Sequence, residues 1–143
     1  MKIWVINGSN LNLLGIREPE IYGSTTYEDL LRLIEAHADA RAVDVKVMQS
    51  NHEGDLVDWV QQALSEGVDG LVLNPGAYTH TSIALYDALK SVRIPAVEVH
   101  ISKIEKRESF RQFSYIRPAC IATITGHGLN GYLEAIDLLI NGK

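Results

Sequence analysis

The stretch GLVLNPGAYTHTSIALYDALKSV, residues 70–92, contains a strand, a turn and a helix in succession. Gly70–Asn74 is a nearly continuous apolar run, which is typical of a parallel strand covered on both faces. Pro75 and Gly76 favour a turn, and Thr81–Val92 continues as a segment of helical period. The stretch therefore predicts one βα unit with a polar connection.

Outward from this unit, apolar β-branched runs alternate with segments of helical period along the chain. The predicted strands are Lys2–Asn7, Val43–Gln49, Gly70–Asn74, Ala96–Ile101 and Ala119–Thr125, and the predicted helices are about Thr26–Ala40, Gly54–Glu66, Thr81–Val92 and Gly128–Asn141. Five βα units predict an α/β fold with an open, doubly wound, parallel five-stranded sheet in the flavodoxin-like order. No linker or repeat divides the chain, so residues 1–143 are expected to form one domain.

Two kinds of signal mark the helix ends. Thr26 with Asp29 fits a capping box at the start of the first predicted helix. Gly67 and Gly142 stand where helix C-termini favour a residue with positive φ.

Composition excludes several classes of protein. Net charge is −5 and no Lys/Arg run exceeds two residues, which argues against a nucleic-acid surface. The apolar run at the N-terminus is too short for a signal peptide or a membrane span. Cys120 is the single cysteine, so an internal disulfide is excluded and a reducing cytoplasm is expected. Its apolar neighbours indicate a buried structural thiol.

The predicted strands are apolar, but the segments at their carboxyl ends contain Asn, Ser or His. In open α/β sheets, ligands bind outside the carboxyl ends of the strands, where these residues gather. Four of the five histidines lie there, so a polar pocket is expected at this edge. The segments concerned are residues 7–10, 50–53, 74–80, 100–102 and 125–127.

The stretch LLGIREPEIYGSTT, residues 13–26, follows neither the helical nor the strand period. It is expected to be an irregular loop that overhangs the pocket. A tyrosine phenol has a reference pKa of about 10, and a nearby guanidinium lowers it. Arg17 and Tyr22 could therefore form an activated base on a closing lid that Pro19 stiffens. A surface loop whose tyrosine packs on a neighbour is the alternative.

His100 closes the fourth predicted strand, and period-two alternation places Glu98 on the same face. A buried carboxylate needs a partner, which an imidazolium supplies. A general acid oriented by its carboxylate and a structural ion pair both remain open.

The segment between Asn74 and Ser82 also has two interpretations. Thr79 or Thr81 is a candidate N-cap, so the segment can be an ordinary βα connection. A helix N-terminus also favours an anionic ligand, in which case Asn74 and His80 would bind hydroxyl groups.

Two kinds of cofactor fit the spacing poorly. The four histidines at strand ends form neither an HxH nor an HxxxH pair, so no metal site is predicted. A flavodoxin-like nucleotide- or flavin-binding module is the alternative function. Residues 7–15 follow a strand, but they lack GxGxxG and the P-loop lysine, and Leu13 and Leu14 would crowd a phosphate.

Arg107, Arg111 and Arg117 form a basic cluster. A solvated helical turn is the usual explanation. Arg107 and Arg111, spaced i and i+4, would share a helix face and repel unless an anion lies between them. This spacing favours an acidic substrate for at least one arginine.

Three blocks together resemble the type II 3-dehydroquinate dehydratase family. They are NGSNLNLLGIREPEIYG (residues 7–23), NPGAYTHTS (residues 74–82) and EVHIS (residues 98–102). Arg107, Phe110 and Arg111 also fall where the family has them, so the resemblance spans the chain. It implies a flavodoxin-like, cofactor- and metal-free cytoplasmic enzyme of the shikimate pathway that converts 3-dehydroquinate to 3-dehydroshikimate. A homododecamer, built as a tetramer of trimers, is also implied.

The resemblance implies a role for each matching residue. Tyr22 removes the proton α to the ketone, Arg17 keeps Tyr22 ionised, and Asn10 helps hold the water that stabilises the enolate. His100, held by Glu98, protonates the departing hydroxyl. The implied substrate-binding residues are Asn74, His80 and Arg111 for hydroxyl groups, Ile101 and Ser102 for the carboxylate, and Asp87 for a neighbouring subunit's site.

Two residues depart from the family pattern. Ser9 replaces the usual proline and is expected to cost some loop rigidity. Lys103 replaces the asparagine that commonly follows His-Ile-Ser, and it is expected beside the carboxylate pocket. Schiff-base chemistry at Lys103 finds no other support in the sequence.

Overall fold

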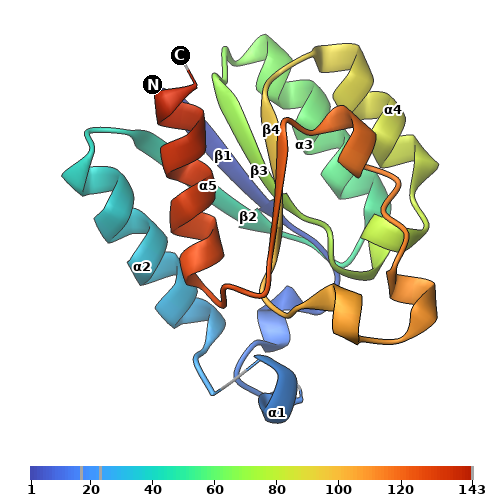
Figure 1. The fold of residues 1–143 in the computed structure, drawn as a ribbon. Coiled ribbons are helices and arrows are strands. Elements are labelled where there is room, and N and C mark those ends of the chain that lie inside the picture. Colours follow the sequence, from blue (N-terminus) through green and yellow to red (C-terminus); the bar gives the residue numbers. More distant parts are fainter. Residues whose placement is uncertain (17, 23, 143) are drawn as a thin grey trace.

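A computed structural model describes residues 1–16, 18–22 and 24–142, with Tyr22 described by its backbone alone. Within this part of the chain, one parallel five-stranded sheet has the order β2-β1-β3-β4-β5 (Figure 1). The strands are β1 Lys2–Asn7, β2 Asp44–Gln49, β3 Gly70–Asn74, β4 Ala96–His100 and β5 Ala122–Thr125. The order is that of the flavodoxin-like fold, as the alternation of elements predicts.

Helices cover both faces of the sheet and bury two apolar layers (Figure 1). Helices α2 (Tyr27–Ala40) and α5 (Asn130–Asn141) pack on one face, and α3 (Glu53–Ser65) and α4 (Ile83–Val92) pack on the other. Strands β1, β3 and β4 are central and buried along nearly their whole length, whereas β2 and β5 are edges and more exposed. The apolar runs of the central strands therefore have the two-sided cover that the sequence predicts.

The start of α2 confirms its predicted capping box. Thr26 Oγ1 accepts from the Asp29 N–H, and the Asp29 carboxylate accepts from the Thr26 N–H at 3.0 Å. Gly67 has the predicted positive φ of 68°, but Gly142 does not, because its φ is −75°. Helix α5 therefore ends without a left-handed glycine.

Helix α4 begins later than predicted. A 3-10 turn over Gly76–His80 lengthens the connection from β3, so neither Thr79 nor Thr81 is its cap. Ser82 is the cap instead, and its hydroxyl accepts from the Leu85 N–H at 3.0 Å.

The loop after β1 is more ordered than predicted. Leu11–Leu13 forms a 3-10 turn, and Pro19–Tyr22 forms a short helix, α1. The prediction of a wholly irregular segment was wrong, because a proline at the first helical position favours a helix start.

Strand β5 begins three residues later than predicted. Arg117–Ala119 forms a 3-10 turn with Pro118 inside it, and the Cys120 N–H bonds to the Arg117 carbonyl at 3.0 Å. The predicted strand start at Ala119 therefore lies in this turn, and the strand itself begins at Ala122.

Candidate active site

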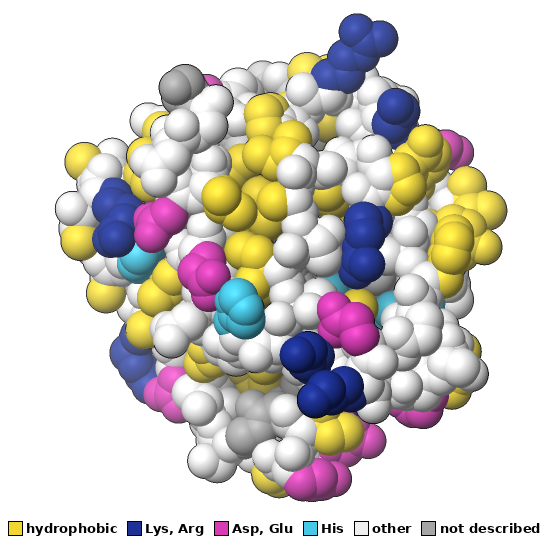
Figure 2. Space-filling view, viewed as in Figure 1, with side chains coloured by type: hydrophobic (Ala, Val, Ile, Leu, Met, Phe, Trp, Pro, Cys, Tyr) yellow, Lys and Arg dark blue, Asp and Glu magenta, His cyan; other side chains and the backbone are white. Residues whose placement is uncertain are grey.

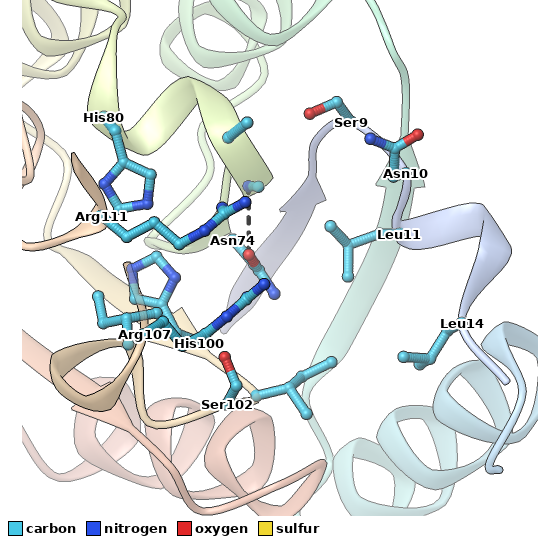
Figure 3. Close-up of a pocket in the computed structure, with 14 residues that line it drawn as sticks. Ser9, Asn10, Leu11, Leu14, Asn74, His80, His100, Ser102, Arg107 and Arg111 are labelled. Atoms are coloured by element: carbon cyan, nitrogen blue, oxygen red, sulfur yellow. Dashed lines mark hydrogen bonds between the residues drawn. The ribbon is translucent and has the colours of Figure 1, made fainter. Parts of the chain in front are cut away.

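A pocket opens at the carboxyl ends of the central strands, as expected from the polar strand ends (Figure 3). Its empty volume is about 580 Å³, counted out to the open mouth. Seven predicted site residues line it: Asn10, Asn74, His80, His100, Ile101, Ser102 and Arg111. The residues come from four separate segments, so only the fold brings them together.

Not every polar strand end reaches this pocket. His80 and His100 line it, but His52 precedes α3 and His127 pairs with Glu134 at 2.9 Å on an exposed surface. All four histidines lie at or after the carboxyl ends of strands, as predicted, but His52 and His127 do not line this pocket. Strands β2 and β5 lie at the sheet edges, and the loops that follow them contact residues of the pocket wall without lining the pocket themselves.

Glu98 and His100 form a buried pair at the end of β4. Glu98 is 0% exposed, and its Oε2 lies 2.5 Å from His100 Nε2. An ionised carboxylate only accepts, so Nε2 carries the hydrogen and Nδ1 is the nitrogen that can act on a substrate. The prediction that period-two alternation pairs these side chains is confirmed.

Two further donors hold the Glu98 carboxylate. Arg117 donates from Nε to Oε1 at 3.2 Å and from its terminal nitrogen to Oε2 at 3.3 Å, and Thr123 Oγ1 donates to Oε1 at 3.3 Å. Burial alone would raise the pKa of Glu98, but the hydrogen bonds from His100 and Arg117 outweigh it and lower the pKa to about 2. Arg117 therefore binds the carboxylate of the Glu98–His100 pair.

His80 faces His100 across the pocket. The two rings stack with centroids 6.4 Å apart, and His80 Nδ1 lies 2.8 Å from the Phe113 carbonyl. A carbonyl only accepts, so Nδ1 carries the hydrogen and Nε2 of neutral His80 is an acceptor. Burial lowers the pKa of His80, with the charges of His100 and Arg111 acting in the same direction. A neutral His80 can accept a hydrogen bond from a hydroxyl group.

Asn74 is fixed from behind by a buried polar chain. Its Nδ2 donates to the Tyr132 hydroxyl at 2.8 Å, and that hydroxyl donates to Asn7 Oδ1 at 2.7 Å. Asn74 Oδ1 accepts from the Gly76 N–H at 3.3 Å (Figure 3). An amide has two N–H groups, so one remains for a ligand. Sequence reasoning missed Tyr132, because an aromatic residue on the apolar face of a helix gives the same signal as core packing.

Asn10 adopts a left-handed backbone conformation at the pocket wall. Its φ is 70°, and its N–H donates to Asn51 Oδ1 at 3.0 Å. Asparagine tolerates this conformation better than most residues. The turn thus presents an exposed amide side chain to the pocket.

Arg107 and Arg111 both line the pocket, although they do not share a helix. They belong to separate 3-10 turns, Ile104–Lys106 with its following residue and Ser109–Arg111. Both extend from the side where His80 and His100 lie, opposite Leu11 (Figure 3). The prediction of one helical face was wrong, but both arginines line the same pocket, and the acidic substrate expected for at least one of them stays a prediction.

Acidic side chains partly balance these arginines. Arg111 Nε lies 2.9 Å from Glu108 Oε1, and Arg107 lies 3.6 Å from Glu18 Oε2. Glu18 precedes α1, so the loop after β1 contacts the mouth of the pocket. This contact supports the predicted position of the loop above the site.

Three predicted site residues remain outside this geometry. Arg17 and the side chain of Tyr22 lie outside the described residues. Asp87 is exposed on α4 and does not line the pocket of its own chain.

The two family departures lie in different places. Ser9 lines the pocket, and its buried Oγ has no hydrogen-bond partner among the described residues. Lys103 is exposed, and its Cβ packs near Gly126 outside the pocket lining. Its neighbours Ser102 and Ile104 both line the pocket, so Lys103 lies beside it, as expected, without lining it.

Other chemistries find little support at this edge. Within the described ranges, no group of three His, Cys, Asp or Glu side chains could hold a metal ion. Burial raises the pKa of the Cys120 thiol to about 12, so a thiolate nucleophile is disfavoured there.

A Cβ on Gly8 would lie 2.0 Å from the Pro75 carbonyl oxygen, so a glycine at this position allows the two loops to pack closely.

The distribution of charged side chains on the surface agrees with a sequence that has no long basic run. On the face shown in Figure 2, basic and acidic side chains are interspersed. Among the described residues, each helix is too short or too polar to span a bilayer.

Comparison with known proteins agrees with the site. Residues 1–140 match the family described as dehydroquinase class II. The 3-dehydroquinate dehydratase of Clostridium acetobutylicum is 55% identical over 141 residues, covering 99% of this chain and 97% of that protein. The crystal structure of type II dehydroquinase from Butyrivibrio crossotus superposes with a TM-score of 0.97 at 52% identity, covering 98% of this chain and 97% of the other. That of Propionibacterium acnes gives 0.93 at 41% identity, covering 98% and 96%. With its parallel sheet, its buried Glu98–His100 pair and these similarities, the chain belongs to the dehydroquinase class II family.

Proposed function

We propose that this protein is a single-domain hydro-lyase that dehydrates 3-dehydroquinate to 3-dehydroshikimate in the shikimate pathway. Family membership supports the reaction, and the His100–Glu98 pair in a pocket lined by amides and arginines supports the chemistry. The strongest structural support for this chemistry is the 2.5 Å contact between His100 Nε2 and the buried Glu98 carboxylate. It directs the other ring nitrogen, Nδ1, towards acid catalysis.

The reaction proceeds through an enolate, with a separate base and acid. The Tyr22 phenolate, held ionised by Arg17, takes the proton α to the ketone. Asn10 helps hold the water that stabilises the enolate oxygen. As the enolate collapses, His100 Nδ1 gives its proton to the departing hydroxyl, which leaves as water. No cofactor or metal is required, because each proton has a donor or acceptor on the chain.

The polar lining binds the substrate in one orientation. Neutral His80 accepts from one hydroxyl, and Asn74 offers its remaining N–H to another. Arg111 adds a charged donor that Glu108 keeps in position. The carboxylate binds at Ile101 and Ser102, whose carbonyls are fixed by the Gly128 and Gly126 N–H groups at 3.2 and 3.1 Å. A fixed backbone makes this segment suitable for reading a planar carboxylate.

Asp87 acts on a neighbouring subunit in a cytoplasmic homododecamer, a tetramer of trimers. Its exposed position on α4, away from its own pocket, supports this role. Asp87→Ala is expected to weaken both activity and assembly, measured by light scattering beside the assay. A native protein that is fully active as a monomer would contradict this part of the proposal.

The function is tested by adding 3-dehydroquinate to the purified protein and recording the ultraviolet absorbance of the conjugated enone product. His100→Asn should remove the activity while leaving the fold intact, because it keeps a polar side chain at a nearly buried position. Absence of turnover by the native protein would overturn the proposal. Copurification of a flavin or nucleotide would instead favour a binding module.

A further inference from the structure

Glu98 binds an imidazole and a guanidinium at once. Its Oε2 contacts His100 at 2.5 Å and the Arg117 terminal nitrogen at 3.3 Å, while its Oε1 accepts from Arg117 Nε at 3.2 Å and from Thr123 at 3.3 Å. A carboxylate has about four lone-pair sites, and these four bonds use them all. The general acid therefore faces a carboxylate that a guanidinium has already partly neutralised.

The turn that carries Arg117 is firmly anchored. Ile116 is fully buried, and the Arg117 N–H donates to Ser114 Oγ at 3.2 Å. The Arg117 carbonyl accepts from the Cys120 N–H at 3.0 Å. The Arg117 side chain is 42% exposed and Glu98 is 0% exposed, so the guanidinium reaches inward from the surface. A fixed backbone with an inward-reaching fork suits a positioning role.

Among the described residues around the Glu98–His100 pair, Arg117 is the main cation that contacts Glu98. On the pocket side of His100, burial favours the neutral form of His80. Beside Glu98, the Cys120 thiol is neutral because its pKa is raised to about 12. The ionisable groups near the pair among the described residues are His80, Arg107 and Arg111 from the pocket and Arg117 and Cys120 from the turn before β5. Glu105, from the turn after β4, is an exposed carboxylate that interacts with the charge of Arg117.

From this geometry, and resting on the proposed function, we propose that Arg117 is a positioning residue that makes His100 a stronger general acid by sharing the Glu98 carboxylate. A lone carboxylate would hold the imidazolium proton tightly. Neutralising that carboxylate weakens the hold, because less negative charge faces the ring. The fork also fixes the orientation of the carboxylate that receives the Nε2–H.

The test compares Arg117→Gln, Arg117→Lys and the parent. In the profile of kcat/KM against pH, the alkaline limb reports loss of the proton from the acid. Arg117→Gln should move this limb upward by about 0.5–1 pH unit, a moderate shift because water screens a half-exposed guanidinium. It should also lower kcat on the plateau about 2–10-fold, since a weaker acid transfers its proton less readily. Arg117→Lys keeps the charge but loses the planar fork, so it should move the alkaline limb upward by less than Arg117→Gln does.

The matched control is Arg93→Gln. Arg93 lines the same surface groove as Cys120 but makes none of the bonds to Glu98. This variant removes the same charge and should leave the profile unchanged. A shift of equal size in Arg93→Gln would attribute the effect to net charge and overturn the role of Arg117.

A second readout does not depend on turnover. The His100 ring is titrated by nuclear magnetic resonance, with its signal assigned by comparison with His100→Asn. Its midpoint should rise in Arg117→Gln by the same amount as the kinetic limb. An unchanged midpoint overturns the inference, whatever the enzymatic activity. A parent that does not turn over 3-dehydroquinate, together with a shifted midpoint, would sink the proposed function and leave the role of Arg117 supported.

Discussion

The Tyr132 hydroxyl lies between the last residues of two neighbouring strands. It accepts from Asn74 Nδ2 at 2.8 Å and donates to Asn7 Oδ1 at 2.7 Å, and Asn7 and Asn74 are paired in the β1–β3 register. Burial raises the pKa of Tyr132, so it remains a phenol and keeps its donor. One hydroxyl from α5 therefore sets the orientation of an amide in the pocket wall.

Tyr132→Phe should affect both stability and binding. It leaves the two buried amide groups without this partner, which costs about 1–3 kcal/mol of unfolding free energy. Because Asn74 loses its fixed orientation, KM should rise more than kcat falls. Urea unfolding and steady-state kinetics measure the two effects.

Tyr27→Phe is the control for this prediction. Tyr27 accepts from Asn7 Nδ2 at 3.4 Å and belongs to the same polar chain, but it does not contact Asn74. It should lower stability slightly and leave KM unchanged. An equal rise of KM in both variants would show that the effect is general loosening and not the orientation of Asn74.

Two variants separate the contribution of the Asn10 backbone conformation from that of its side chain. Asn10→Gly keeps the left-handed φ of 70° without strain, whereas Asn10→Ala costs about 1–2 kcal/mol there. Both variants lose the amide, so both should lose a similar factor in kcat, while only the alanine variant loses thermal stability. Full activity in Asn10→Gly would exclude a role for the amide at the enolate.

The lowered pKa of Glu98 makes the free energy of unfolding depend on pH. Its folded pKa, about 2, lies below the ordinary value of 4.5, so between these values the unfolded chain binds more protons. Stability then rises with pH, and the contribution of Glu98 is complete above about pH 4.5 and lost as pH falls towards 2. This contribution is at most about 3–4 kcal/mol. The stability difference between the parent and Glu98→Gln, measured by urea unfolding, should be constant above pH 5 and shrink below pH 4.5. A difference that persists unchanged at low pH would contradict an ionised Glu98.

Arg17→Gln tests the proposed base. If Arg17 holds the Tyr22 phenolate, the acid-side limb of kcat/KM should move to higher pH, at about 1.4 kcal/mol of lost phenolate stabilisation per unit. The rate constant should fall far more than substrate affinity, and Tyr22→Phe should abolish the reaction. An unshifted limb with normal turnover would assign Arg17 no role in ionising Tyr22.

We expect that Lys103 forms no covalent bond with the substrate, and two experiments at this residue test that expectation. Its exposed side chain lies outside the pocket lining, so Lys103→Met should keep turnover within about two-fold, as surface changes away from a site usually do. Borohydride added during turnover should trap no adduct. A stable mass increase at Lys103 in the parent, detected by mass spectrometry, would overturn this expectation.

The sequence by itself determined the sheet, its order and the edge at which the site lies. These features follow from local signals, because apolar runs, helical period and capping residues act within a few positions of each other. The pairing of Glu98 with His100 also has a local cause, since alternate residues of a strand share a face. The family blocks added the expected roles of residues such as Tyr22 and Asn10.

Only the tertiary structure decided which polar residues meet. Tyr132 contacts Asn74 across 58 positions of sequence, and Arg117 reaches Glu98 across 19. His52 and His127 carry the same local signal as His80, yet they follow edge strands and do not line the pocket. The directions of long side chains depend on where separate turns pack against the sheet, and local sequence does not specify that packing.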